Sequence, residues 1–125
     1  MTQLTVIGNL ASDPELKFTP QGKAVCQFVV ISSKSRKNES GEWESSDVTS
    51  WYVNVWDALA ENTAESLSKG SPVIVYGTAV WKSWESKDTA EKRGRLEITA
   101  IDVAHSLKRG TVKASASKRP IADPF

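Results

Sequence analysis

The sequence predicts an all-β domain, a small barrel of five strands with one short helix between the third and fourth strands. Three observations lead to this prediction. Five segments are rich in β-branched or alternating apolar residues, one segment has the apolar spacing of a helix, and polar or turn-forming stretches separate them. At 125 residues, the chain is long enough for one such domain and short for two.

The first two predicted strands are residues 4–10, LTVIGNL, and residues 24–33, AVCQFVVISS. Both runs are apolar and β-branched, which favours strands. The stretch between them carries the turn signals Asp13-Pro14 and Pro20-Gln21-Gly22, so we predict a loop there. The polar residues 34–48, KSRKNESGEWESSDV, then predict a long loop or a mobile hairpin.

The third predicted strand, residues 49–56, has two different faces. Trp51, Val53 and Val55 alternate with a second set of side chains, so we expect them on one face and buried. The other face carries Ser50, Tyr52, Asn54 and Trp56.

Residues 57–70, DALAENTAESLSKG, predict the helix. Asp57 is a suitable N-cap and Gly70 stands where a helix C-terminus favours glycine. The apolar stripe consists of Leu59, Ala60, Thr63, Ala64 and Leu67.

The last two predicted strands are residues 72–80 and 95–103. Gly8 and Gly77 fall inside strands, at positions where a small barrel bends sharply or bulges. Three strands, a helix and two strands fit a five-stranded OB-fold barrel. A split βαβ sandwich is the alternative, but it needs a helix after the first strand, where the sequence has loop signals.

Composition excludes several classes of function. No apolar run approaches the roughly 20 residues of a membrane span, and no basic region precedes the apolar start, so we expect a cytoplasmic protein. One cysteine, Cys26, excludes an intrachain disulfide, and one cysteine with one histidine cannot form a structural zinc site. His105 has no nucleophile or carboxylate pair at motif spacing and no glycine-rich phosphate loop occurs, so neither an enzyme nor a cofactor is expected.

Charge is distributed unevenly along the chain. Residues 1–104 hold 11 Lys and Arg against 14 Asp and Glu, a net charge of −3, whereas residues 105–125 hold 5 against 1, a net charge of +4. A polyanion site on the body therefore has to be a local patch that concentrates cations.

The five tryptophans divide by their neighbours. Trp84 shares a strand face with Lys82 and Trp43 lies in a polar segment, so we expect both to be at least partly exposed. Trp56 shares a face with Tyr52 and Asn54, and for this residue a core position and an exposed position stay equally open. Trp51 is expected to be buried, and the role of Trp81 stays open.

Exposed aromatic rings among cations suit single-stranded nucleic acid, because bases stack on the rings and cations offset the phosphates. The candidate cations in the polar segments and at the strand ends are Lys34, Arg36, Lys37, Lys82, Lys87, Lys92, Arg93 and Arg95. Each segment also contains acidic residues, so a solvated charged loop is the alternative for each.

Several segments, in one order, resemble the bacterial single-stranded DNA-binding proteins, which are homotetrameric OB-fold proteins. The segments are VIGNLASDPELKFTPQGKAV, ESGEWES, WDALAENTAESLSKGSPVIVYG and KSWESKDTAEKRGRLEI, which together span about residues 4–104. The resemblance implies an OB-fold domain over residues 1–104 that binds single-stranded DNA without sequence preference during replication, recombination and repair. It also implies a homotetramer associated with the nucleoid.

The resemblance also assigns roles to single positions. The family's stacking aromatics fall on Trp56 and Trp84, and its basic residues fall on Lys82 and Lys69. Tyr52 stands where some relatives have a basic residue, so stacking or hydrogen bonding is expected there instead. Ser50 and the pair Ser35-Arg36 stand where many members carry further aromatics, and Trp51 and Trp43 are nearby candidates to replace them.

The tail, residues 105–125, departs most from the family. It is short and basic, with a shortened tip of Asp123, Pro124 and Phe125 where members carry a long acidic tip that docks replication and repair proteins. The tip is either a shortened docking site or a remnant on a paralogue or phage form. Residues 106–114 are a candidate extra strand that clamps a neighbouring subunit. The alternative function is an OB-fold protein-interaction module of a replication-restart or recombination complex.

Overall fold

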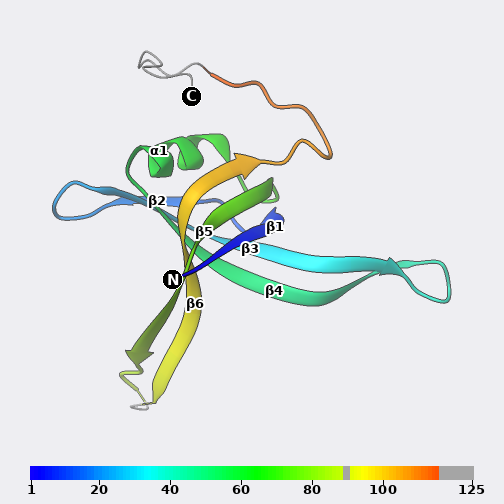
Figure 1. The fold of residues 1–125 in the computed structure, drawn as a ribbon, viewed down its shortest axis with the longest axis horizontal. Coiled ribbons are helices and arrows are strands. Elements are labelled where there is room, and N and C mark those ends of the chain that lie inside the picture. The colour runs from blue at the N-terminus through cyan, green and yellow to red at the C-terminus, as the bar shows by residue number, and fades with distance from the viewer. Residues whose placement is uncertain (89–90, 116–125) are drawn as a thin grey trace.

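The computed structural model describes residues 1–88 and 91–115. Its elements are β1 (Thr2–Leu10), β2 (Glu15–Phe18), β3 (Ala24–Lys37), β4 (Trp43–Trp56), α1 (Asp57–Ser66), β5 (Pro72–Glu85) and β6 (Lys92–His105). Figure 1 shows a central body from which the β3–β4 and β5–β6 hairpins extend in different directions. No helix among the described residues is long and apolar enough to cross a bilayer.

Five of the strands close into the predicted barrel. β1 pairs with β5 along most of its length and with β3 at Asn9 and Leu10, which completes the circuit β1–β5–β6–β4–β3–β1. Neighbouring strands are antiparallel except β4 and β6, which pair in parallel over Tyr52, Val53 and Asn54. The helix lies between the third and fourth barrel strands, β4 and β5, as predicted for an OB-fold.

The barrel interior is filled by the inward side chains of the alternating strands. Val30, Val55 and Ile98 are fully buried, and Ala60 and Thr63 of α1 close one end of the core. The predicted helix stripe is therefore confirmed in its central positions. Burial of such aliphatic side chains stabilises the fold by roughly 1.5 to 3 kcal/mol for each of the larger ones.

Gly8 and Gly77 lie where strands approach each other closely, as predicted. A Cβ atom on Gly8 would lie 2.3 Å from the carbonyl oxygen of Ile31, and one on Gly77 would lie 2.3 Å from that of Thr99. The register of β5 against β6 also shifts between Tyr76 and Gly77. These two glycines permit the tight crossing of strands that a small barrel needs.

The prediction of a loop throughout residues 11–23 is wrong for Glu15–Phe18, which form β2 at the edge of β3. All four of its residues are exposed, so the strand is held by its backbone pairing with β3. Leu16 and Phe18 alternate with charged residues, but over four residues only and between two turn signals, which is too short to mark a strand.

The polar residues 34–48 form the hairpin alternative of the prediction. β3 continues to Lys37 and β4 starts at Trp43, and the β5–β6 hairpin likewise extends beyond its predicted ends, to Glu85 and Lys92. In the turn, the side chain of Asn38 accepts hydrogen bonds from the amides of Ser40 and Glu42. Cross-strand hydrogen bonds continue these ladders into solvent, together with side-chain contacts between the paired strands such as that of Lys37 with Trp43.

Both predicted helix ends need correction. Asp57 is the first residue of α1 and not its N-cap; the N-cap is Trp56, which makes no side-chain capping bond. β4 passes into α1 without a linker, so the chain turns at Asp57 with φ of 62°, a left-handed conformation that Asp tolerates better than most residues. Leu67 is the C-cap, whereas Gly70 lies in the following turn, where its amide donates to Leu10.

The described part of the tail, residues 106–115, contains no helix or strand. The amide of Ser106 donates to the carbonyl of Pro72, which ties the start of the tail to β5. A clamp strand at 106–114 requires a neighbouring subunit and stays a prediction, as does the division into domains at residue 104. The tip residues Asp123, Pro124 and Phe125 lie outside the described residues.

Candidate functional site

One outward face runs across strands β3, β4, β6 and β5, and the strand register places half of the predicted residues on it. Tyr52 is paired with Glu97, Lys82 with Arg95, and Trp84 with Arg93, so these side chains point to the same side of the sheet. We call the residues that share this side the outer face: Gln27, Tyr52, Asn54, Trp56, Lys82, Trp84, Arg93, Arg95 and Glu97.

Exposure of the side chains follows the predicted alternation of β4. Val53 and Val55 are buried in the barrel, whereas Trp56 is 41% exposed on the outer face. Trp84 is 45% exposed, as its alternation with Lys82 predicts. Large aromatic rings are therefore open to solvent at both ends of this face.

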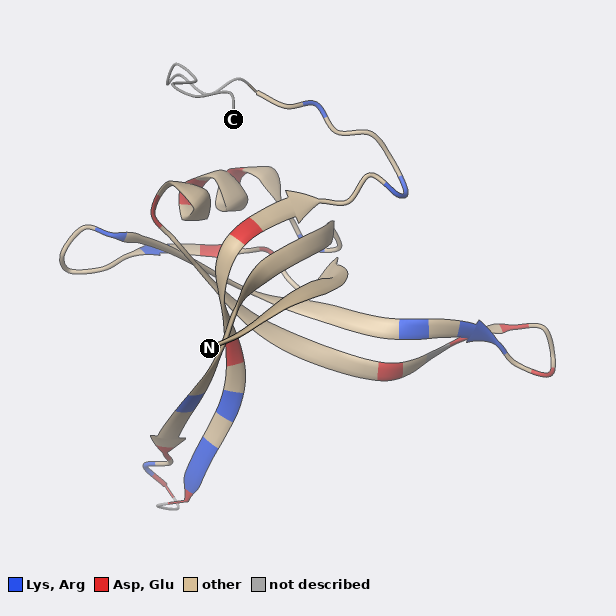
Figure 2. Ribbon diagram, viewed as in Figure 1, with Lys and Arg blue, Asp and Glu red and all other residues tan. Residues whose placement is uncertain are grey.

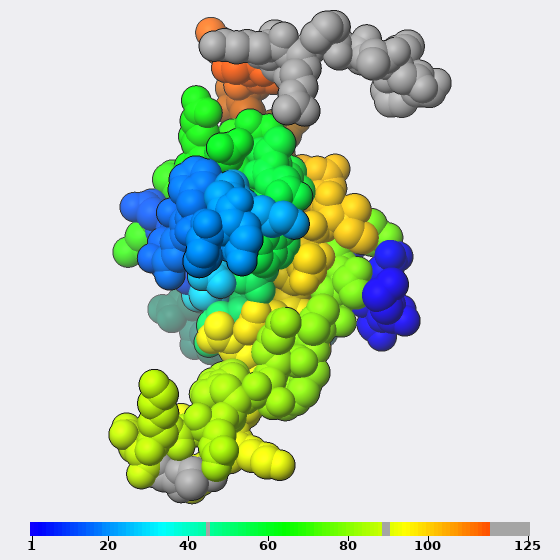
Figure 3. All heavy atoms as spheres, turned by 90° about the vertical axis from the view of Figure 1, so that its left-hand side faces the viewer, coloured from blue at the N-terminus to red at the C-terminus, as the bar shows by residue number. Residues whose placement is uncertain are grey.

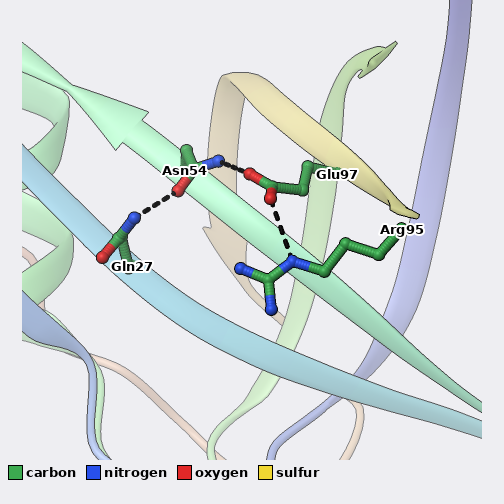
Figure 4. A network of polar contacts seen from close by, with 4 residues as sticks. All are labelled: Gln27, Asn54, Arg95 and Glu97. Atoms are coloured by element: carbon green, nitrogen blue, oxygen red, sulfur yellow. Dashed lines mark hydrogen bonds and ion pairs between the residues drawn. The ribbon is translucent and has the colours of Figure 1, made fainter. Parts of the chain in front are cut away.

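A chain of hydrogen bonds crosses the centre of the outer face (Figure 4). Gln27 Nε2 donates to Asn54 Oδ1 at 2.9 Å, and Asn54 Nδ2 donates to Glu97 Oε1. Arg95 Nε donates to the other carboxylate oxygen of Glu97 at 2.9 Å. The network fixes the orientation of both amide side chains and of the guanidinium group.

Glu97 is a nearly buried carboxylate, with 9% of its surface exposed. Burial by itself raises its pKa, but hydrogen bonds from Arg95 and Asn54, together with the positive charges of Arg95 and Lys82, hold the pKa of Glu97 below its ordinary value. The group is thus a fixed anion that holds two cations close to it.

Arg95 also contacts aromatic rings. Its guanidinium carbon lies 4.1 Å from the centre of the Tyr52 ring and 5.6 Å from that of Trp84. Both distances lie within the range of a cation–π contact. Arg95 therefore connects the ring of the barrel wall with the ring of the β5–β6 hairpin.

The remaining predicted cations are distributed over both hairpins (Figure 2). Lys34 forms an exposed ion pair with Asp47 at 3.9 Å, and the Lys37 ammonium lies 5.6 Å from the centre of the Trp43 ring. Arg36 follows on the same strand. Lys34 pairs with Ser46 and Lys37 with Trp43, at the opposite end of β3 from Gln27, so these residues lie apart from the hydrogen-bond network.

The other hairpin carries Lys87, Lys92 and Arg93, all exposed. Lys69 lies in the turn between α1 and β5, where its backbone amide donates to the Asp13 carboxylate at 2.7 Å. The structure thus brings Lys82, Arg93 and Arg95 onto the outer face, whereas Lys69 lies outside the network.

Two members of the network, Gln27 and Glu97, are absent from the sequence-predicted site. The alternation in RLEITAIDV could have revealed Glu97, because Arg95, Glu97 and Thr99 share one parity and Ile98 is buried on the other. Gln27 is likewise the polar residue between two buried ones in β3. Nothing in one sequence shows that these two residues meet Asn54.

The other candidate residues lie away from the outer face. Trp51, which was expected to be buried, is only partly buried against the core, and its Nε1 donates to Ser32 Oγ at 2.8 Å. Cys26 is fully buried, which raises the pKa of its thiol. His105 Nδ1 donates to the carbonyl of Ser106. Among residues 1–88 and 91–115, no group of three or more His, Cys, Asp or Glu side chains is placed to hold a metal ion.

Comparison with known proteins gives one consistent result. The model of the "Single-strand binding protein family" matches residues 1–106. A protein of Mycolicibacterium smegmatis named single-stranded DNA-binding protein is 41% identical over 119 residues, covering 94% of this chain and 72% of the relative. One of the same name from Corynebacterium glutamicum is 42% identical over 120 residues, covering 95% of this chain and 52% of the relative.

Among solved structures, the fold matches a small single-stranded DNA-binding protein from Streptomyces coelicolor with a TM-score of 0.74. The match covers 87% of this chain and 97% of the other at 23% identity, which supports the OB-fold architecture.

Proposed function

The chain belongs to the single-strand binding protein family, and from this premise we propose that it binds single-stranded DNA without sequence preference on its outer face. One observation supports this site above the others: three aromatic side chains, Tyr52, Trp56 and Trp84, share a face with Lys82, Arg93 and Arg95. Aromatic faces accept any base, and cations neutralise the phosphates between the bases.

Trp56 and Trp84 are the proposed stacking residues. Each ring is close to half exposed, so one side is available to a base while the other contacts the protein. Stacking of one base on such a ring contributes about 1 to 3 kcal/mol to binding. The remaining site cations, Lys34, Arg36, Lys37, Lys69, Lys87 and Lys92, and the exposed Trp43, are proposed to contact DNA that extends beyond this face.

Tyr52 has a different proposed role, because Arg95 already lies over its ring. Guanidinium planes stack on bases as aromatic rings do. We propose that Tyr52 holds Arg95 as a flat cationic platform and that a base stacks on the guanidinium group. Asn54, which is fixed by Gln27 and Glu97, then offers its polar groups to a base edge or a sugar.

Glu97 offsets part of the positive charge of the face. An anion near a phosphate-binding site weakens phosphate binding at short range, so the phosphates are expected to pass over Lys82 and Arg93 and the bases over Glu97. Because the body carries a net charge of −3, DNA binding requires a patch in which the cations that meet phosphates are separated from acidic groups.

The proposed cellular role is protection of single-stranded DNA in replication, recombination and repair by a cytoplasmic, nucleoid-associated protein. Proteins of this family bind DNA and are not enzymes, and we propose the same for this chain. An interaction module of a recombination complex is the second candidate, favoured by Glu39, Glu42, Glu44 and Asp47 on the β3–β4 hairpin, which offset its cations.

A homotetramer is part of the proposal. β1 pairs with β3 only at Asn9 and Leu10, so that, as far as the described residues show, most of its edge on that side is open to pairing with another strand. Ile7 on this strand is 65% exposed, an apolar surface suited to a subunit contact. Docking of replication and repair proteins by Asp123, Pro124 and Phe125 stays a prediction.

Tryptophan fluorescence during a titration with oligo-dT tests the proposal. Strong quenching that weakens with added salt is the expected result, because stacking changes the environment of the rings and binding releases counterions. No change in fluorescence, together with no DNA binding by anisotropy, would leave the interaction module as the better account.

A further inference from the structure

Trp81 lies on the opposite side of the β5–β6 hairpin from Trp84. It is paired across the strands with Leu96, whereas Trp84 is paired with Arg93, so the two indoles emerge on different faces. Trp81 is 65% exposed, more than Trp56 or Trp84. Within the described part of the chain, Trp81 belongs neither to the buried core nor to the side chains packed against it.

The glycine on the neighbouring strand determines how the indole lies. A Cβ atom on Gly94 would be 2.3 Å from Cζ2 of Trp81 and 2.6 Å from its Cε2, so the ring rests directly against the backbone of Gly94. The indole is therefore in contact with the hairpin through Cε2 and Cζ2, while most of its surface is exposed. A ring that is already held against the backbone loses little conformational freedom when a ligand stacks on it.

This part of the hairpin stands away from the barrel (Figures 1 and 3). β6 pairs with β4 only at residues 97–99, and β5 pairs with β1 only as far as Ala79. Within the described residues, the strands on either side of Trp81 and Gly94 thus pair only with each other, and both edges of the arm are open. The arm is two strands wide, with about 5 Å between strands, so a few nucleotides suffice to pass from one face to the other.

The charge of the arm suits a polyanion. Residues 81–96 carry Lys82, Lys87, Lys92, Arg93 and Arg95 against Glu85, Asp88 and Glu91, a net charge of +2 on a body whose net charge is negative. Lys92 has the same strand parity as Gly94 and therefore shares the face of Trp81, together with its cross-strand partner Glu85, whereas Lys82, Arg93 and Arg95 lie on the outer face. A cation and an open indole on one face are the two elements that single-strand binding uses.

We propose that Trp81 is a second stacking platform for single-stranded nucleic acid, on the reverse face of the β5–β6 hairpin. A strand that stacks on Trp84 continues around the open edge of the arm and places a later base on Trp81, with Lys92 near its phosphates. The inference rests on the proposed function, since it extends the same DNA path from one face of the arm to the other.

The test compares the variants Trp81→Ala and Trp84→Ala with oligo-dT of two lengths. A short oligomer of about 8 nucleotides lies within the roughly 4 to 16 nucleotides that one OB-fold covers, and a long one of about 40 nucleotides exceeds it. Trp81→Ala is expected to weaken binding of the long oligomer by roughly 5- to 100-fold, the equivalent of one unstacked base, and to leave the short one almost unchanged. Trp84→Ala is expected to weaken both.

Two further variants keep the result interpretable. Trp81→Phe retains an aromatic face and is expected to recover much of the affinity for the long oligomer. Gly94→Ala forces the indole of Trp81 away from the sheet and is expected to lower the affinity for the long oligomer without removing the ring. Thermal unfolding by circular dichroism checks that each variant is folded.

Unchanged affinity of Trp81→Ala for the long oligomer, with both affinities reduced in Trp84→Ala, overturns this inference and leaves the proposed function intact. Unchanged affinities in both variants, with Trp56→Ala equally silent, overturn the proposed function itself. If Trp81→Ala instead lowers the mass of DNA-free assemblies in light scattering without altering affinity, a second copy of the chain occupies the face and the inference is wrong.

Discussion

The guanidinium carbon of Arg95 lies 4.1 Å above the ring of Tyr52, although the two residues are far apart in the chain. The parallel pairing of β4 and β6 makes this contact possible, because it aligns Tyr52 with Glu97 and brings the preceding residues of β6 over the ring. Glu97 then holds the guanidinium in place through Nε. A planar cation is thus built into the middle of the outer face.

Removal of the Arg95 guanidinium should affect DNA binding and stability by separate routes. Arg95→Gln removes the cation over Tyr52 and leaves the nearly buried carboxylate of Glu97 without its charged partner, which we expect to lower the free energy of unfolding by about 1 kcal/mol. Urea unfolding measures this change. The double variant Arg95→Gln with Glu97→Gln should recover the stability but not the DNA affinity, and parallel recovery of both would contradict the proposed stacking role.

Protonation of Glu97 should lower the free energy of unfolding at acidic pH. Because its pKa in the folded protein is held below that in the unfolded chain, the ionised group contributes stability that is fully present above the unfolded value of about 4.3 and is lost as the pH falls through the folded value. In Glu97→Gln this contribution is absent. Unfolding measured from pH 6 down to about pH 3 should therefore show a shallower pH dependence in the variant; identical slopes would exclude this role for Glu97.

Each stacking tryptophan should contribute separately to binding. Trp56→Ala and Trp84→Ala are each expected to lose about 1 to 3 kcal/mol of binding free energy for oligo-dT, because a base loses its aromatic platform. The conservative variant Trp84→Phe keeps a ring and should lose less. Affinities measured by fluorescence anisotropy provide the test, and an alanine variant that binds normally would place its residue outside the site.

Salt dependence should distinguish cations that contact phosphates from those paired elsewhere. Lys82→Ala should reduce the slope of log K against log salt by about 0.7 for each phosphate that Lys82 neutralises. Lys34, which forms an exposed ion pair with Asp47, provides a matched control for removal of one charge. The experiment uses DNA that is short enough to cover only the outer face. If Lys34→Ala then changes the slope of log K against log salt as much as Lys82→Ala does, the proposed phosphate contact of Lys82 is wrong.

The strand crossing at Gly77 should tolerate no side chain. A methyl group there would meet the backbone of Thr99 at 2.3 Å, so Gly77→Ala is expected to destabilise the barrel by about 1 to 3 kcal/mol. Gly110→Ala is the control, because nothing lies within 4 Å of its added atom. Comparison of the two melting temperatures decides the point, and equal values would show that the strands can separate at the bulge.

The sequence predicts those parts of the fold in which burial leaves a pattern. Alternation in β4 separates Val53 and Val55 from Tyr52 and Trp56, because one side of the strand faces the core. β2 alternates over four residues only, and none of its side chains is buried, so its pattern is too short to mark a strand. The N-cap was predicted one residue too late for a different reason. Asp57 is a residue type that favours the N-cap, but because β4 passes directly into α1, Asp57 is the first helical residue and its own backbone makes the turn.

The candidate site was predictable in its aromatic residues and less so in its polar ones. Trp56 and Trp84 can be recognised in the sequence by polar neighbours of the same strand parity. The role of Glu97 depends on its hydrogen bonds with Asn54 of β4 and Arg95 of β6, which the sequence does not reveal. The register between β4 and β6 cannot be read from either strand alone. The polar network therefore emerges only in three dimensions.

The parallel contact between β4 and β6 covers three residue pairs, from Tyr52 to Asn54, and it joins two long hairpins that otherwise diverge. A change in the angle between the two hairpins would have to occur at this short contact, which the hydrogen-bond network also spans. DNA bound across the contact would resist such a change, since separating the hairpins would separate bases from the aromatic rings on which they stack. Hydrogen exchange at the amides of residues 52–54, where β4 pairs with both β3 and β6, should then slow on binding more than exchange in β1, which contributes no residue to the outer face.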